Sequence, residues 1–134
     1  MSDELKEQMK QQVKKILDEL SKFWEYIRKI KEDGLSGIMD MVKNVDAILG
    51  IFMVVAAAIE QVADGFDDEV GGREKREVAA ELLDEYFKFE NIFLEIVDRA
   101  LFKLLISLAV SVMNRDYGDD EWPDAEDMVD ELPE

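Results

Sequence analysis

The sequence predicts an all-α protein, an antiparallel four-helix bundle with a long first helix and an acidic C-terminal tail. Apolar residues recur at spacings of three and four through most of the chain, which is the period of an amphipathic helix. β-branched residues form no alternating runs, and only two prolines and seven glycines interrupt the pattern. Because 134 residues suffice for one domain with a core, we predict a bundle domain over residues 1–115. The tail, residues 116–134, has room for one short helix.

The pattern of apolar residues over residues 2–31 predicts one continuous helix. These residues form a stripe like the apolar seam of a coiled coil. Ser2 and Asp3 suit the N-cap, and Gly34 suits the position just after the helix. Such a helix is about 45 Å long, so its far end is expected to overhang the bundle or meet another copy. The seam is formed by Leu5, Met9, Val13, Ile16, Leu20, Phe23, Ile27 and Ile30.

A second helix is predicted from Ser36 to about Ala63. Its second half, Ile48 to Ile59, is apolar on all sides, which favours the central helix of a bundle. A subunit interface and a shallow membrane contact are the alternatives. The longest uncharged run, Ala47–Ile59, has thirteen residues, whereas a membrane-spanning helix needs roughly 20.

Residues 64–72 are predicted to form a loop because they contain three glycines. Four acidic residues in this loop raise the question of calcium binding. Their spacing is not that of an EF-hand, so a solvated acidic loop is the preferred interpretation. The acids are Asp64, Asp67, Asp68 and Glu69.

A third helix is predicted over residues 73–90, with Glu81 and Glu85 on its outer face. A di-iron site would need Glu-x-x-His motifs, and the chain has no histidine. The fourth helix, residues 92–114, is apolar over most of its circumference, so we expect other helices to surround it. Leu104, in the middle of its most apolar face, is predicted to be buried.

No catalytic, cofactor-binding or metal-binding residues are predicted, and we expect the protein not to be an enzyme. Histidine and cysteine are absent, which excludes disulfides, thiol chemistry, a histidine base and the usual zinc sites. Gly71-Gly72 lacks the spacing of a phosphate-binding loop. Ser107 and Ser111 have no base to activate them and are expected to bond to carbonyls one turn earlier.

The net charge of −17 is concentrated after residue 45. Residues 1–45 hold nine basic and nine acidic residues, whereas residues 116–134 hold ten acids and no base. Such a surface repels nucleic acid and anionic lipid. We therefore expect no nucleic-acid partner and no membrane partner.

Two helices that are apolar nearly all round exceed what a four-helix monomer can bury. This predicts a homo-oligomer, with a dimer as the first expectation, formed through a symmetric contact. The predicted interface residues are Ile51, Val55, Leu101 and Leu105.

The tail has apolar residues that a purely solvating segment would not need. Pro123 suits the first turn of a short helix, on which Ala125 shares a face with the other apolar residues. Peptides that dock into a hydrophobic groove use such a face. In the alternative, Trp122 folds back and covers the end of the bundle. The predicted partner-binding residues are Trp122, Met128, Val129 and Leu132.

One segment resembles a pattern in small helical phage proteins. Gly71 to Leu83 reads Gly-Gly-Arg-Glu-Lys-Arg-Glu-Val-Ala-Ala-Glu-Leu-Leu, and Ile96-Val-Asp-Arg-Ala, Val110 and Asn114 follow. Over about residues 60–118 this is similar to proteins grouped with the phage LL-H type holins. The resemblance implies a phage or prophage origin, a role in assembly or lysis, and a place in the host cytoplasm or the virion.

The function expected from the sequence is that of a non-enzymatic helical assembly or adaptor protein. It would self-associate through its apolar helices and present an acidic tail to a protein partner. The alternative is a holin-like membrane-associated lysis protein that uses residues 46–63 and 92–114 as a hairpin. We expect no cofactor in either case.

Overall fold

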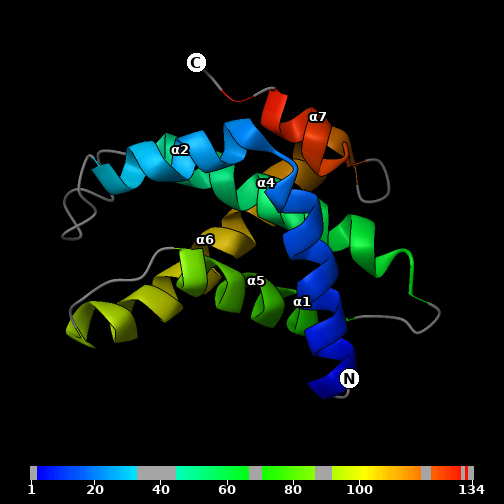
Figure 1. Cartoon of the computed structure of the whole chain (residues 1–134), viewed down its shortest axis with the longest axis horizontal. Helices are drawn as coiled ribbons and strands as arrows, with labels where there is room; N and C mark the ends of the chain where they lie inside the picture. Colours follow the sequence, from blue (N-terminus) through cyan, green and yellow to red (C-terminus); the bar gives the residue numbers. More distant parts are fainter. Residues whose placement is uncertain are drawn as a thin grey trace.

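The chain is all-α over the residues that the computed structural model describes, which are 3–32, 45–66, 71–86, 92–118, 122–130 and 132. The predicted fold class is therefore confirmed, but the antiparallel four-helix arrangement is not. These residues form six helices, whose arrangement is shown in Figure 1. They are α1 (Asp3–Asp18), α2 (Ser21–Glu32), α4 (Val45–Ala63), α5 (Gly72–Tyr86), α6 (Ile92–Tyr117) and α7 (Ala125–Asp130).

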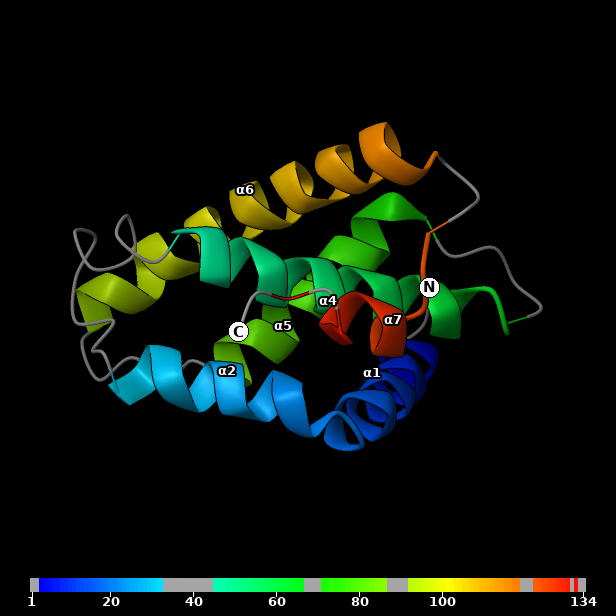
Figure 2. The same cartoon turned by 90° about the horizontal axis from the view of Figure 1, so that it is seen from above.

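Helix α4 is the centre of the fold. It contacts α1, α2, α5, α6 and α7, and Figures 1 and 2 show it between the other helices. Every residue from Ile51 to Ile59 except Met53 is buried. A helix that is apolar on all sides is stable only when it is enclosed, so this segment has the central position that its composition predicts. The predicted start of the helix at Ser36 lies outside the described residues.

The long first helix predicted over residues 2–31 is wrong, because the chain turns after Asp18 and continues as α2. Figure 1 shows the two helices running in clearly different directions. At the turn, the carbonyl of Leu17 accepts a hydrogen bond from the backbone N–H of Leu20 at 3.0 Å. It also accepts one from the indole Nε1 of Trp24 at 2.9 Å. The indole thus donates a hydrogen bond to a carbonyl group at the end of α1, where the break in the helix leaves carbonyl groups without their helical partners.

The bend lets both halves of the predicted seam pack on the core. Met9, Val13 and Leu17 of α1 are fully buried, as is Phe23 of α2. Both helices contact α4. A straight helix of this length would carry its second half past α4, so burial of apolar surface outweighs the local preference for a continuous helix.

A ladder of ion pairs joins α1 to α5. The lysines of α1 lie four residues apart, as do the glutamates of α5, so each element presents one charged stripe. Glu81 and Glu85, predicted on the outer face, are the main acceptors in this ladder. The pairs are Lys6–Glu77 at 3.5 Å, Lys6–Glu81 at 2.9 Å, Lys10–Glu81 at 3.8 Å, Lys10–Glu85 at 3.0 Å and Lys14–Glu85 at 2.8 Å.

Helix α6 lies at the edge of the molecule and is covered on one side only (Figure 2). Ile106, Ala109 and Met113 are buried on the side that packs against α4 and α5. On the other side the exposed fractions of Leu104 and Leu108 are 66% and 48%. The prediction that Leu104 is buried is therefore wrong. The helix is apolar nearly all round, but in the described part of the chain no other helix lies over that side.

The tail forms the predicted short helix, α7, and folds onto the body. Its buried face of Ala125, Met128, Val129 and Leu132 is the face predicted from the spacing. Gly50 allows this contact, because a Cβ at that position would lie 2.6 Å from Cδ2 of Leu132. Lys22 of α2 donates a hydrogen bond to the carbonyl of Leu132 at 3.0 Å. The tail thus shares its core with α4.

Candidate functional site

The four predicted interface residues lie in two places. Ile51 and Val55 of α4 have no exposed surface in the single chain, because the surrounding helices of the same chain already cover them. Neither side chain is therefore available for a contact with a second copy. Leu101 and Leu105 belong to α6, but their side chains lie outside the described residues.

The residues predicted to bind a partner through the tail are largely covered by the chain itself. Met128, Val129 and Leu132 are buried, and α7 contacts α4 and α2. The indole Nε1 of Trp122 donates a hydrogen bond to Oδ1 of Asn114 at 2.8 Å, which attaches the start of the tail to the end of α6. In the single chain these residues are therefore largely covered, as in the alternative in which Trp122 folds back, and binding of a partner by the tail stays a prediction.

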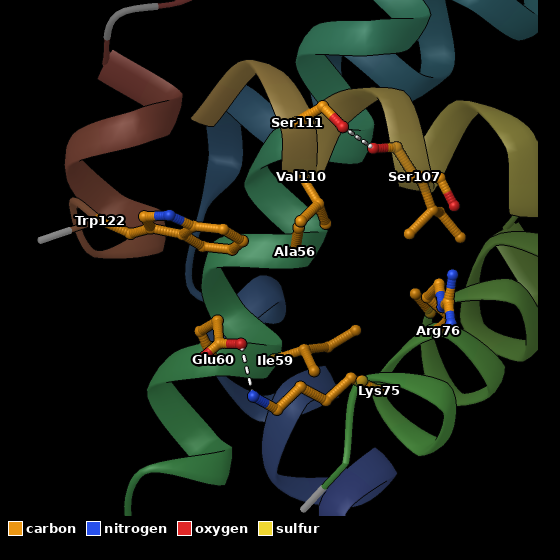
Figure 3. Close-up of a pocket in the computed structure, with 12 residues that line it drawn as sticks. Ala56, Ile59, Glu60, Lys75, Arg76, Ser107, Val110, Ser111 and Trp122 are labelled. Atoms are coloured by element: carbon orange, nitrogen blue, oxygen red, sulfur yellow. Dashed lines mark hydrogen bonds and ion pairs between the residues drawn. The ribbon is translucent and has the colours of Figure 1, made fainter. Parts of the chain in front are cut away.

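Between α4, α5, α6 and Trp122 the fold leaves a pocket of about 320 Å³ (Figure 3). This volume is at the lower end of the range for small-molecule sites, about 300–1,000 Å³. Two alanines, Ala56 of α4 and Ala79 of α5, contribute to the lining and leave space where longer side chains would fill it. The other apolar lining residues are Ile59, Ile106, Val110 and Trp122.

Two basic residues of α5 reach the pocket, and they differ in their partners. Nζ of Lys75 lies 2.6 Å from Oε1 of Glu60, so this lysine is committed to an ion pair within the pocket wall. Arg76 is exposed and has no ion-pair partner among the residues that the structure describes. Figure 3 shows Arg76 on the side of the pocket opposite Trp122. With Lys75 and Glu60 neutralising one another, the described lining residues carry one net positive charge.

Two hydroxyl groups of α6 complete the lining. Oγ of Ser111 donates a hydrogen bond to the carbonyl of Ser107 at 3.0 Å, as the sequence predicted for a serine on an apolar helix. Because the hydrogen of this hydroxyl is used within α6, the lone pairs of the Ser111 oxygen can still accept a hydrogen bond from another group. The pocket thus combines apolar walls, one guanidinium and hydroxyl groups, and its lining includes no histidine, cysteine or other nucleophile with a base.

Sequence reasoning did not single out Glu60, Lys75 or Arg76. A signal was present, since only seven basic residues follow residue 45 and three of them fall within the four residues 73–76. A basic cluster in the acidic part of the chain marks a place where negative charge can be accepted. The sequence does not show that Lys75 and Arg76 lie beside a pocket, because this depends on how α5 is rotated against its neighbours.

The described residues contain no group of three or more acidic side chains that could hold a metal ion. Asp64 of the acidic loop is exposed, whereas Asp67, Asp68 and Glu69 lie outside the described residues. Whether this loop binds calcium is therefore not tested, and a solvated acidic loop stays the prediction from the sequence.

A search of the described helices finds none with the length and apolar character needed to cross a membrane. The hairpin of the holin-like alternative would use α4 and α6. In this structure Ile51, Val55 and Ile59 of α4 are buried beneath other helices of the same chain.

Comparisons with protein-family models, curated proteins and solved structures give no match to this chain. Nothing in them links the chain to holins or to phage proteins, so the resemblance over residues 60–118 stays an expectation from the sequence alone.

Proposed function

We propose that the protein is a non-enzymatic helical assembly protein that self-associates through the outer face of α6. The observation that supports this function is the exposure of Leu104 and Leu108, at 66% and 48% of their surface. They are the exposed large hydrophobic side chains of the described chain, and they lie one helical turn apart. Adjacent exposed apolar side chains, on a helix that buries Ile106, Ala109 and Met113 on another side, are typical of a surface for another protein.

The distribution of charge favours a second copy as the occupant. With a net charge of −17, two copies repel one another over most of their surfaces. The stretch from Arg99 to Arg115 is the longest in the chain without an acidic residue, and it contains three basic residues. Two copies can therefore approach with the least repulsion along this part of α6.

Size sets a requirement on the contact. A stable protein–protein interface buries about 800 Å² on each partner, which two leucines cannot supply. The acid-free stretch of α6 has 17 residues and a length of about 25 Å. Two such helices packed side by side, with neighbouring α5 and α4 surface at their edges, supply an area of the required order. The sequence predicted Ile51 and Val55 at the interface, but both are buried within the chain. The proposed interface contains the exposed Leu104 and Leu108 in their place.

The experiment is sedimentation equilibrium across a wide range of protein concentration. The wild-type chain, of 15.4 kDa, is expected to approach twice this mass. The double substitution Leu104→Lys and Leu108→Lys should give a monomer, because it places two charges in the apolar contact. Loss of association in this variant cannot come from added net repulsion, since the two lysines reduce the negative charge of the molecule.

Gln8 and Gln12 of α1 provide the matched control. They are also exposed and four residues apart, and their double substitution by lysine changes the net charge equally. This control should associate as the wild type does. A wild-type mass of 15.4 kDa at every concentration, or a double variant that still dimerises, would contradict the proposal.

A further inference from the structure

We propose that the pocket between α4, α5, α6 and Trp122 binds a small amphipathic carboxylate, an apolar chain that ends in one carboxyl group. Occupancy of this pocket is a separate property from self-association, because the pocket lies within one chain and does not include Leu104 or Leu108.

The apolar part of such a ligand is matched by the walls. Ile59, Ile106 and Val110 line the pocket with aliphatic surface, and the indole of Trp122 lies on the side opposite Arg76 (Figure 3). The cavity of about 320 Å³ is large enough for a small organic molecule and far larger than a water-sized void. Filling it with an aliphatic chain removes apolar surface from water on both partners.

The polar end of the ligand is matched by Arg76. Its guanidinium has no ion-pair partner in the described chain, and a carboxylate can accept two parallel hydrogen bonds from such a group. Lys75 is already paired with Glu60 at 2.6 Å, and the Ser111 hydroxyl donates its hydrogen to the carbonyl of Ser107, so neither the lysine charge nor the hydroxyl hydrogen is free for a second negative charge. A single negative charge therefore fits better than a phosphate with two.

Neighbouring charges distinguish Arg76 from Lys75 and Arg73. Lys75 pairs with Glu60 at 2.6 Å, and Arg73 pairs with Glu77 at 3.5 Å. Both basic groups are satisfied within the protein, so only Arg76 gains a new partner when a carboxylate enters.

The test is a titration of the full chain with decanoate, kept below its micelle concentration, followed by ¹H–¹⁵N NMR. The indole N–H of Trp122 reports on the pocket, whereas that of Trp24 belongs to a separate aromatic cluster with Phe23 and Tyr86. We expect saturable shifts of the Trp122 indole and of the Ala79 amide, with little change at Trp24.

Three variants define the site. Arg76→Gln should weaken decanoate binding by about tenfold, since it removes a charge-assisted pair, and should leave binding of the neutral 1-decanol unchanged. Arg73→Gln loses the same charge from the same helix and should bind decanoate as the wild type does. Ala79→Leu should weaken binding of both molecules because its side chain occupies the pocket.

The proposal is overturned if the wild-type shifts do not saturate, or if they concentrate at Leu104 and Leu108 on the outer face of α6. It is equally overturned if Arg76→Gln binds decanoate with unchanged affinity. Because Arg76 is exposed and unpaired in the described chain, this variant should fold even if the Ala79 variant does not.

Discussion

At single positions, burial in this chain depends on which element lies opposite a residue. Leu83 and Leu104 are the same residue type in regular helices, yet Leu83 is fully buried and Leu104 is 66% exposed. Leu83 of α5 faces the core, whereas Leu104 lies on the side of α6 that no described helix covers. Hydrophobicity thus indicates that a side chain gains from burial, and the neighbouring elements decide whether it is buried.

This difference predicts unequal costs of truncation. Leu83→Ala should reduce the free energy of unfolding by about 2–5 kcal/mol, because it removes buried methyl groups and leaves a cavity. Leu104→Ala should reduce it by less than about 1 kcal/mol, since an exposed side chain loses little on truncation. Urea denaturation at low protein concentration, where self-association is absent, measures both values. Equal losses would mean that the outer face of α6 is covered within one chain.

The hydroxyl of Tyr86 is the exception among the buried polar groups of the described residues. Its ring makes edge contacts with Phe23 and Trp24, at centroid distances of 6.0 and 4.9 Å, but its oxygen is buried without a hydrogen-bond partner. Burial, together with the nearby carboxylates of Asp18 and Glu85, raises the pKa of this hydroxyl well above its ordinary value. The hydroxyl is therefore neutral at pH 7.

Removing this hydroxyl should stabilise the protein. Tyr86→Phe keeps the ring contacts and is expected to raise the free energy of unfolding by about 1 kcal/mol, since an unsatisfied buried polar group is lost. Tyr26→Phe, at a partly exposed position, should bring no such gain. A clear loss of stability in Tyr86→Phe, measured by urea denaturation, would show that the hydroxyl has a hydrogen-bond partner in solution.

At the scale of elements, the ion-pair ladder between α1 and α5 shifts the pKa of its members. Partial burial alone would raise the pKa of Glu85, but hydrogen bonds from Lys14 and Lys10 outweigh it and hold this pKa below its ordinary value. Partial burial alone would likewise lower the pKa of Lys10, yet the hydrogen bond to Glu85 and the charges of Glu85, Glu81 and Glu7 together outweigh it, and the pKa is raised. Each charged form is thus favoured by its partner on the other helix.

The ladder predicts a pH dependence with a definite sign. A carboxyl whose pKa is lowered by folding stabilises the protein above its unfolded pKa, and this contribution is lost as the pH falls through the folded pKa. Glu85→Gln should therefore cost about 0.5–1 kcal/mol at pH 7, a value typical of partly exposed ion pairs. The difference from the wild type should vanish as Glu85 becomes protonated in acid. Glu25→Gln, at an exposed position of α2, is the control and should cost much less than Glu85→Gln at pH 7. A cost that persists in acid would assign the role of Glu85 to packing.

At the scale of the whole molecule, the enclosed α4 favours compaction and the net charge of −17 opposes it. The ion pairs of the ladder are short-range, whereas repulsion among 33 acidic residues extends across the molecule. Salt screens distant charges first, because the Debye length falls from about 30 Å at 0.01 M to about 8 Å at 0.15 M ionic strength.

Added sodium chloride should therefore raise the midpoint of urea denaturation at pH 7 and strengthen self-association. The same addition near pH 4.3, the isoelectric point of the sequence, should have little effect because the net charge is then close to zero. Destabilisation by salt at pH 7 would show that the ion pairs outweigh the net repulsion.

The sequence by itself determined the all-α class, the positions of α5 and α6, the enclosure of Ile51–Ile59 and the apolar face of the tail helix. These features depend on the local spacing of apolar residues, and a helix presents that spacing whatever surrounds it. Only the tertiary structure decided the turn after Asp18, the side of α6 that stays uncovered, the docking of the tail against Gly50, and the pocket beside Arg76. Each of these depends on which helices pack against a given surface. The free energy of burial depends on the apolar area that the helices remove from water and very little on their order in the chain.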